Sequence, residues 1–382
     1  MNSYIVIHYH EIGLKGKNRL HFIKMLINNV KKKCEPMEFR YIIESGQVTL
    51  EIEKKDEKKY SEILDKIPGI AFFSIATRTT LDLDDIKNEV ITVLKKKDFS
   101  TFRITTKRHD KNHGTQSQEV NRQVGAEVVE KLKKKVSLKE PELTVKIETT
   151  FEHSYISFQD VPGCGGLPTD QRQKVVALLS GGFDSPVAAY MMMKRGCEVI
   201  LVHFHNKNVD KTSVESKIKQ LAKQLSKFQL KTKLIIVPFD EIQKEIIVKV
   251  NSTLRMLVYR RFMIKIASMI AKDERARFLV VGDSLSQVAS QTFNNLRATY
   301  HGEEIHILSP VIGLDKDEII KITRRIGTFD ISAQPAGDCC SFFLAKHPEL
   351  KSDVKTLLRI EEGIDVDKFV KEAIEKIRVV EC

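Results

Sequence analysis

The sequence lacks several features that define other classes of protein. No apolar run in its 382 residues is long enough to cross a membrane, and the N-terminal segment has neither a basic start nor a cleavable apolar core. We therefore expect a cytoplasmic protein with no membrane partner. Internal repeats and low-complexity tracts are also missing, so the length indicates two or three globular domains.

Cysteine is scarce, and its spacing does not fit a metal site. The six cysteines form no C-x-x-C pair and no zinc-ligand spacing, which argues against a disulfide scaffold or structural zinc. The alternation His203-Phe204-His205 is compatible with a metal pair, but a histidine at a strand end is more often a polar terminus. We assign no metal ligand. The unusual feature is the vicinal pair Cys339-Cys340.

Acidic residues are outnumbered by basic ones. Lys and Arg total 63 against 51 Asp and Glu, giving a formal net charge of +12. This balance favours a polyanionic partner, and nucleic acid is the first candidate. Abundant lysine is also common on thermophile surfaces, so charge alone does not decide.

The first part of the chain alternates between strand and helix patterns. Their order is strand, helix, strand, strand, helix, strand, which is typical of a ferredoxin-like α+β domain. A domain of this kind can be structural or can bind RNA. The expected elements are Tyr4–Tyr9, Asn18–Lys33, Glu38–Glu44, Gln47–Glu53, Asp56–Lys66 and Ile70–Thr79.

A second α+β stretch follows and contains a basic loop. The loop spans Lys107–Gln118, and basic side chains there and in the next helix form either a phosphate-tracking surface or a solvated one. Both interpretations remain open. The expected elements are helices Asp84–Lys96 and Glu119–Lys135 and strands Thr101–Thr106, Leu143–Thr149 and Ser154–Phe158.

The clearest linker is the Pro- and Gly-rich stretch Pro162–Pro168. Beyond it, short apolar runs alternate with helical patterns, which predicts a parallel sheet covered on both faces. The predicted strands are Val175–Leu179, Glu198–Phe204, Lys233–Val237, Phe278–Val281 and Ile305–Leu308. We expect domains at residues 1–56, 57–162 and 174–382, with residues 163–173 as linker.

One stretch, KVVALLSGGFDSPV at Lys174–Val187, indicates phosphate chemistry. A buried strand runs into Ser180-Gly181-Gly182, and a helix follows whose Asp/Ser/Pro start suits its first turn. Adjacent glycines let backbone N–H groups approach an anion, and a helix N-terminus favours negative charge. No Gly-Lys-Ser/Thr follows, so this is not a Walker A loop. SGGxDS resembles the PP-loop of ATP pyrophosphatases.

Several motifs in order resemble those of the tRNA 4-thiouridine synthase (tRNA uracil 4-sulfurtransferase) family. The resemblance covers essentially the whole chain, and the set is far more specific than SGGxDS alone. The motifs are HEIGLKGKNR at His10–Arg19, the THUMP-like RITTKRHDKNHGTQSQEVNRQVG at Arg103–Gly125, the PP-loop, GDSLSQVASQTFNNL at Gly282–Leu296, PVIGLDKDEIIKITRRIGT at Pro310–Thr328 and AGDCCSFF at Ala336–Phe343.

The resemblance implies an ATP-dependent reaction on tRNA. ATP adenylates the C4 oxygen of the uridine at position 8, pyrophosphate leaves, and sulfur then displaces AMP. Asp184 is expected to hold Mg²⁺ or to order the loop. The implied nucleotide contacts are Leu178, Leu179, Ser180, Gly181, Gly182, Ser185, His203, Phe204, Arg260, Gly282 and Gln291. The candidate RNA-binding residues are Lys15, Lys17, Arg19, Lys107, Arg108, Lys111 and Arg122.

Sulfur transfer needs a persulfide carrier or bound sulfide. Cys340 matches the family's reactive cysteine, with Cys339 as a resolving partner. We expect no rhodanese domain of the kind that some relatives have, and the C-x-x-C that some archaeal relatives carry is absent from Arg261–Lys272. The donor therefore stays open between a persulfide carrier such as a cysteine desulfurase, free sulfide, and an iron–sulfur cluster shared with another chain. A role in thiamine thiazole synthesis is also open.

Two other functions compete with sulfur transfer. A different PP-loop enzyme would let an amine attack the adenylated group, in which case Cys340→Ser would leave the product unaffected. A non-catalytic RNA-binding protein would bind tRNA in a salt-dependent way without releasing pyrophosphate. A homodimer is expected if tRNA bridges an RNA-binding half and a catalytic half on different chains.

Overall fold

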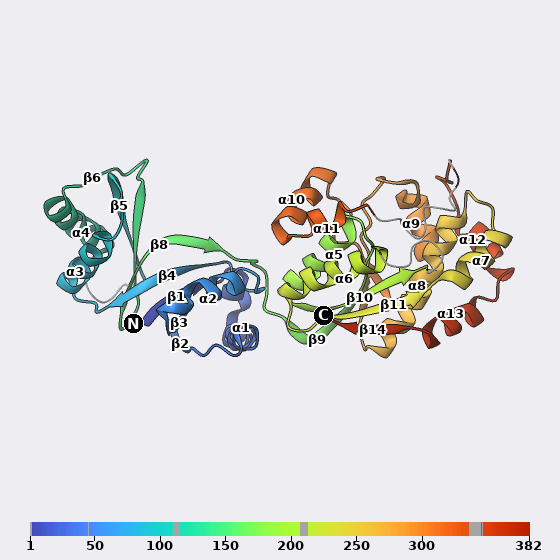
Figure 1. Cartoon of the computed structure of the whole chain (residues 1–382), viewed down its shortest axis with the longest axis horizontal. Coiled ribbons are helices and arrows are strands. Elements are labelled where there is room, and N and C mark those ends of the chain that lie inside the picture. The colour runs from blue at the N-terminus through green and yellow to red at the C-terminus, as the bar shows by residue number, and fades with distance from the viewer. Residues whose placement is uncertain (1, 45, 110–114, 207–212, 336–344, 346) are drawn as a thin grey trace. The chain divides into compact units, whose positions relative to one another are not determined.

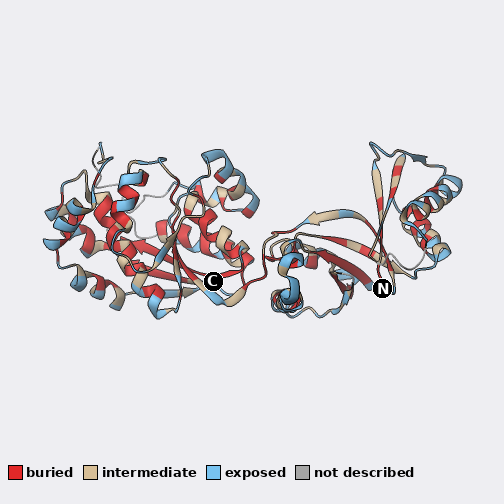
Figure 2. Cartoon of the chain, turned by 180° about the vertical axis from the view of Figure 1, so that it is seen from behind, coloured by how far each residue is buried: buried red, intermediate tan, exposed pale blue. Residues whose placement is uncertain are grey.

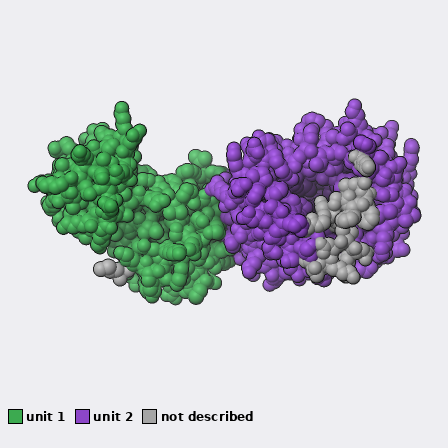
Figure 3. Space-filling view, turned by 45° about the horizontal axis from the view of Figure 1, so that its top comes forward, with its two compact units in different colours: residues 1–168 green, residues 169–382 purple. Residues whose placement is uncertain are grey.

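The computed structural model describes residues 2–44, 46–109, 115–206, 213–335, 345 and 347–382. The chain forms two compact units, Met1–Pro168 and Thr169–Cys382, which Figure 3 shows in different colours. Each unit has a β-sheet whose strands are mostly buried and helices that are buried on one face (Figure 2). In the described residues, no helix is both long and apolar enough to span a bilayer.

The first unit begins with the predicted ferredoxin-like arrangement, which is confirmed. Strand order is β2-β3-β1-β4, and neighbouring strands are antiparallel (Figure 1). In β3, Val48, Leu50 and Ile52 face the core of this half as their alternation predicts. The elements are β1 (Asn2–His8), η1 (Glu11–Asn18), α1 (Arg19–Cys34), β2 (Arg40–Glu44), β3 (Gln47–Glu53), η2 (Lys54–Asp56), α2 (Glu57–Leu64) and β4 (Phe72–Thr79).

The core of this half continues past residue 56, where the first domain was expected to end. Tyr60 and Leu64 of α2 and Phe73 of β4 pack with Leu26 of α1 in one cluster. A ferredoxin-like sheet needs both helices to cover one face, so α2 and β4 belong to the same packing unit as β1 and α1.

The second half of the unit extends the same sheet. Strand β4 pairs with β8, and the order continues β8-β7-β5-β6, giving an eight-stranded sheet among the described residues. Its own core lies between this part of the sheet and α3 and α4. The elements are α3 (Leu83–Leu94), β5 (Thr101–Arg108), α4 (Ser117–Leu132), β6 (Lys135–Val136), β7 (Leu143–Thr149) and β8 (Ser154–Pro162).

The second unit contains the predicted parallel sheet, in the order β13-β12-β9-β10-β11-β14. Strands β9 and β10 pair in parallel, as do β10 and β11, β9 and β12, and β12 and β13, whereas β14 is antiparallel to β11. The strands are β9 (Asp170–Leu178), β10 (Cys197–His205), β11 (Lys233–Pro238), β12 (Phe278–Val280), β13 (His306–Leu308) and β14 (Arg378–Glu381).

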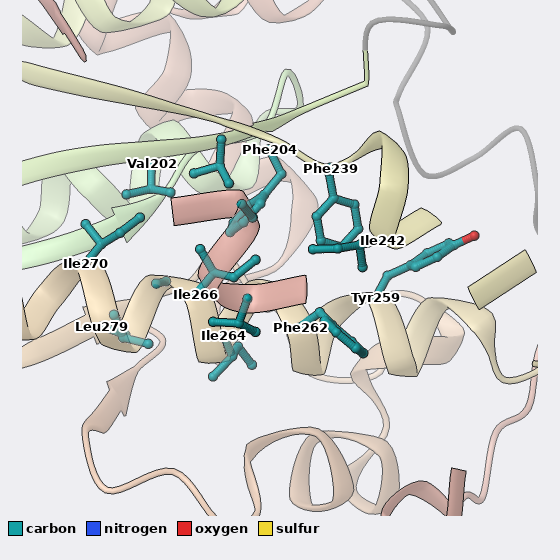
Figure 4. Packing of buried hydrophobic residues seen from close by; sticks show 14 of the residues in the cluster. Val202, Phe204, Phe239, Ile242, Tyr259, Phe262, Ile264, Ile266, Ile270 and Leu279 are labelled. Atoms are coloured by element: carbon teal, nitrogen blue, oxygen red, sulfur yellow. The ribbon is translucent and has the colours of Figure 1, made fainter. Parts of the chain in front are cut away.

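Helices cover both faces of this sheet (Figure 1). On one face α5 (Asp184–Lys194), α6 (Ser213–Leu225), α10 (Lys316–Ile326) and α11 (Phe329–Ser332) pack together. On the other lie α7 (Asp240–Lys249), α8 (Arg255–Asp273), α12 (Val354–Glu362) and α13 (Val366–Glu375), with α9 (Phe293–Tyr300) against α8. Figure 4 shows the core on this second face, where Phe204 and Tyr259 each lie edge-on to Phe239.

One expected helix end is wrong, and one strand was not expected. Helix α4 ends at Leu132 rather than Lys135, because Lys133 adopts a left-handed backbone (φ 54°) and Lys135 joins strand β6. After helix α13 the chain returns as β14, an element that the sequence pattern did not predict.

Candidate active site

A cavity of about 280 Å³ lies where the strand order of the second unit reverses. The chain runs from β9 outward through β10 and β11 and then returns to place β12 on the other side of β9, so a crevice opens beyond the carboxyl ends of these strands. The cavity lining includes Asp184 and all the predicted nucleotide contacts except Gly181 and Gly182: Leu178, Leu179, Ser180, Ser185, His203, Phe204, Arg260, Gly282 and Gln291.

The turn between β9 and α5 is held by hydrogen bonds within the loop. The backbone N–H of Ser180 donates to Oγ of Ser185 (2.8 Å), and the two hydroxyls lie 2.9 Å apart. The N–H of Gly182 donates to Oγ of Ser180 (3.3 Å). The SxxxxS spacing thus fixes a loop that places the N-terminus of α5 at the cavity, a position that favours an anion.

Gly282 allows β12 to approach this loop closely. A Cβ at Gly282 would lie 2.7 Å from the backbone N and Cα of Ser185. No side chain fits such a separation, so glycine is required by space rather than by backbone conformation. The glycine therefore brings the two sides of the crevice together.

Arg260 lines the cavity from α8 and is held by Asp283. The guanidinium donates twice to the carboxylate (2.9 and 2.5 Å), which also accepts from Nε2 of Gln291 (3.1 Å) and from the hydroxyl of Tyr300. Burial raises the pKa of the Asp283 carboxyl, but Arg260 and these hydrogen bonds outweigh it and hold the pKa below its usual range. Asp283 is 2% exposed and connects two predicted nucleotide contacts, Arg260 and Gln291.

Arg261 points elsewhere, as expected for an adjacent helical residue. Its guanidinium donates to both carboxylate oxygens of Glu361 in α12 (2.5 and 2.9 Å) and to the carbonyl of Ala298 (2.7 Å). Arg261 therefore joins α8 to its neighbouring helices, and Arg260 is the arginine of this pair that lines the cavity.

His203 is a neutral, buried residue of the cavity wall. Burial lowers its pKa to about 4, and its Nδ1 lies 2.9 Å from the carbonyl of Leu179. A carbonyl only accepts, so Nδ1 carries the proton. Among the described residues, no group of three or more metal-binding side chains gathers here or elsewhere.

Asp184 sits at the first position of α5 with a cationic neighbour. Nζ of Lys316, the first residue of α10, lies 3.3 Å from one carboxylate oxygen, and Nε2 of Gln287 lies 3.4 Å from the other. The Lys316 ammonium also stands over the ring of Phe183 (5.2 Å). A carboxylate and an ammonium thus lie beside the loop between β9 and α5. Lys316 lies within the motif at Pro310–Thr328. Its approach to Asp184 cannot be predicted from that motif, because the two residues are 132 positions apart in the chain.

The candidate RNA-binding residues lie on the first unit, in two groups. Lys15, Lys17 and Arg19 occupy η1 and the start of α1, and Arg19 donates to the hydroxyl of Tyr9 (3.0 Å). Lys107 and Arg108 end β5, and the exposed Arg122 on α4 pairs with Glu119. Lys111 lies outside the described residues.

A buried charged cluster lies beside the second group. Glu148 of β7 accepts from His109 (3.1 Å) and lies 3.0 Å from Nε2 of His8 in β1, with Lys107 at 4.0 Å. Burial raises the pKa of Glu148, but the hydrogen bonds from His109 and His8 outweigh it and lower the pKa to about 2. The cluster connects the two halves of the first unit.

Both cysteines implicated in sulfur transfer, Cys339 and Cys340, lie outside the described residues. Of the cysteines that the structure does describe, Cys34, Cys164 and Cys197 are buried thiols and Cys382 is exposed. Burial raises the pKa of Cys34 to about 12, so this thiol is unreactive.

Comparison with known proteins matches three successive segments of the chain. Protein-family models match in order: the ThiI ferredoxin-like domain at residues 4–74, the THUMP domain at 81–159, and the Thiamine biosynthesis protein (ThiI) family at 170–366. A "Probable tRNA sulfurtransferase" from Caldanaerobacter subterraneus is 37% identical, and the match covers 99% of each chain. One of the same description from Thermus thermophilus is 36% identical, covering 97% of this chain and 92% of its own.

Solved structures show the same resemblance. A crystal structure of a 4-thiouridine synthetase–RNA complex with bound ATP superposes with a TM-score of 0.89 at 30% identity, covering all of both chains. PH1313 from Pyrococcus horikoshii shares the fold, with a TM-score of 0.67 at 22% identity over 86% of this chain.

Proposed function

Because this chain belongs to the ThiI family, whose relatives are described as tRNA sulfurtransferases, we propose that it is an ATP-dependent tRNA uracil 4-sulfurtransferase. It adenylates the C4 oxygen of uridine 8 and replaces that oxygen with sulfur, releasing AMP and pyrophosphate. The main support is one cavity that joins an anion-binding loop to a buried Arg260–Asp283 pair.

The cavity suits the two ends of ATP. Apolar side chains of Leu178, Val202 and Phe204 offer contacts for adenine, and the loop Ser180–Ser185 with the N-terminus of α5 receives the phosphates. The uridine oxygen attacks the α-phosphorus, and the bond to the β-phosphate breaks as pyrophosphate leaves. Lys316 lies where it can neutralise charge on that leaving group.

The donor set at the loop fits Mg²⁺. The single carboxylate of Asp184 is typical of a site in which substrate phosphates and water complete the coordination. Asp184 would hold the ion, which neutralises phosphate charge when bound. An iron–sulfur cluster remains a prediction, and iron and acid-labile sulfide assays on protein isolated without oxygen test it.

tRNA is the proposed partner of the first unit. Its support is the basic side chains at η1, the end of β5 and α4, together with the RNA in the related complex. We also propose that sulfur comes from outside the chain. A persulfide carrier would transfer its outer sulfur to the Cys340 thiolate and leave as a thiol, with Cys339 as the resolving partner, whereas free sulfide would itself displace AMP from the adenylated uridine. A homodimer is tested by the molar mass in solution with and without tRNA.

The decisive experiment supplies unmodified tRNA, ATP, Mg²⁺ and sulfide. We expect pyrophosphate release and the near-ultraviolet absorbance of 4-thiouridine. Asp184→Asn should abolish both, whereas Cys340→Ala should abolish only the thiouridine when a persulfide donor replaces sulfide. If tRNA causes no conversion of ATP to AMP in the wild-type protein, the proposal is wrong.

Sulfur delivery for thiamine thiazole synthesis is a second candidate, favoured by the description of the family as a thiamine biosynthesis protein. Growth of a strain that depends on this chain, with and without added thiazole, distinguishes the two roles. If the Asp184→Asn variant supports growth without thiazole and the Cys340→Ala variant does not, sulfur delivery is separate from adenylation.

A further inference from the structure

Helix α11 is bonded directly to the loop Ser180–Ser185, which the proposed function assigns to the phosphates. Oγ of Ser332 donates to the carbonyl of Gly182 (3.0 Å), across 150 positions in the chain. In a trans peptide the carbonyl and the next N–H point in opposite directions, so this bond also sets the direction of the Phe183 N–H. Phe183 is the N-cap of α5, and the first N–H groups of a helix have no partner within it. One hydroxyl from outside the loop thus orients a peptide group at the start of α5.

The Phe183 side chain is held by the same part of the fold. Its ring lies 5.6 Å from that of Phe329 in α11, and the Lys316 ammonium of α10 lies 5.2 Å from its centre. The Arg324 guanidinium, also from α10, stands over the Phe329 ring (4.0 Å). Cations are attracted to the faces of aromatic rings, so these contacts are favourable. Helices α10 and α11 therefore restrain both the backbone at Gly182 and the side chain that follows it.

A buried lysine of α6 holds Ser332 in turn. Lys217 is 6% exposed, and its Nζ donates to the carbonyls of Ser332 (2.8 Å) and Gln334 (2.9 Å). It also lies against the loop, since a Cβ built at Gly181 would stand 3.5 Å from Cδ, Cε and Nζ of Lys217. The other buried residues of α6 are all apolar, and an apolar side chain at this position would avoid the cost of desolvating a charge. The carbonyls that it binds therefore account for the lysine better than packing does.

A loop with adjacent glycines needs such support from outside. Glycine loses more conformational freedom on ordering than any other residue, so Gly181 and Gly182 are the costliest positions of the loop to hold still. We propose that Ser332 is a positioning residue that fixes the Gly182–Phe183 peptide in the orientation that presents its N–H to phosphate, and that Lys217 fixes Ser332. The inference rests on the proposed function, because it deepens the assignment of this loop to the phosphates of ATP. A backbone donor that is already oriented costs no reorganisation when the anion binds.

The test compares ATP with adenosine, which has the same base and ribose but no phosphate. In Ser332→Ala, calorimetric titration should show an affinity for ATP that is about 2- to 10-fold weaker, the worth of one hydrogen bond, while competition titration shows an unchanged affinity for adenosine. Lys217→Met should weaken ATP binding in the same direction. Ser226→Ala is the matched control, because the Ser226 hydroxyl also donates to a backbone carbonyl (2.8 Å) but lies in η3 (Ser226–Phe228), outside the cavity lining. It should change neither affinity.

Equal weakening of ATP and adenosine binding in Ser332→Ala would show that the hydroxyl supports the cavity as a whole, and would overturn the inference. Unchanged ATP affinity in Ser332→Ala would overturn it too, whether or not Lys217→Met folds. Denaturant unfolding of each variant shows that the titrated protein is folded. Because binding is measured without tRNA, the result does not depend on turnover. A wild-type protein that binds ATP but converts none to AMP with tRNA would overturn the proposed function and leave this inference standing.

Discussion

The two units present their candidate binding groups in opposite ways. In the second unit, residues from β9, β10, α8 and β12 converge on one cavity, and most of their polar groups are bonded to one another. In the first unit, the basic residues are spread over η1, β5 and α4, and Lys17, Lys107 and Arg122 are exposed.

This difference corresponds to two kinds of ligand. A nucleotide is small and is selected by a few side chains and backbone groups that are already in place before it binds. Each of these groups therefore contributes strongly to nucleotide binding. A tRNA backbone is long and is attracted by many separate charges, each of which contributes a small, salt-dependent share. Substitutions should therefore have large effects on the cavity and small, additive effects on the basic surface.

The largest effect is expected for Asp283→Asn. The change leaves the Arg260 guanidinium buried without its charge partner and loosens Gln291, so the free energy of unfolding of the second unit should fall by about 3–5 kcal/mol. Denaturant unfolding measures this loss, and the KM for ATP should rise as well. Unchanged stability would show that the pair is not what holds Arg260 in place.

Gly282→Ala should come next. The added methyl would contact the Ser185 backbone at 2.7 Å, so β12 or α5 must shift, at a cost of about 1–3 kcal/mol and a weaker affinity for ATP. Gly313→Ala is the matched control, because nothing lies within 4 Å of a Cβ there. Calorimetric titration with ATP compares them, and equal affinities for the two variants would contradict the proposed close approach.

Glu148→Gln tests a buried charge in the first unit. The pKa of Glu148 is lowered to about 2, so its ionised form stabilises the fold above pH about 4.5, and this contribution is lost as the pH falls toward 2. At neutral pH we expect the variant to lose about 1–3 kcal/mol. Unfolding followed between pH 2 and 7 should show a flatter profile for the variant than for wild type in the acid range. Parallel profiles would mean that Glu148 does not titrate as described.

The smallest effect is expected for Lys107→Gln. The Lys107 side chain is 60% exposed, so its loss should weaken tRNA binding only modestly and reduce the slope of log K against log salt by about 0.7–0.9 if one phosphate contact is lost. Filter binding at several salt concentrations measures the slope. Lys139→Gln, an exposed lysine outside the predicted group, is the control, and an equal change in both variants would remove Lys107 from the RNA surface.

Local patterns in the sequence predict most of the fold. The alternation in β3 and the helical spacing in α1 and α3 identify these elements, and short apolar runs identify the parallel strands. Strand β14 was missed because four mostly exposed residues have no pattern of their own and become a strand only by pairing with β11.

The sequence likewise predicts one part of the candidate site and misses another. Its loop is visible in the sequence because SGGxDS is contiguous, whereas Asp283 and Lys316 make their contacts in the site with partners 23 and 132 residues away. The periodicity of apolar residues in the sequence does not indicate such long-range contacts. Burial offers the clearest signal once the fold is known, since Asp283 is a charged residue that is only 2% exposed.

Strand β14 is also expected to limit association of the protein with itself. It covers the outer edge of β11, whose Leu234, Ile235 and Ile236 form part of an apolar run, and Arg378 fastens it to Glu215 of α6. Without Arg378–Glu381, that edge would offer unpaired backbone groups beside a strongly β-forming segment, which is the usual template for intermolecular strand pairing. We therefore expect these four residues to help keep the sheet from aggregating.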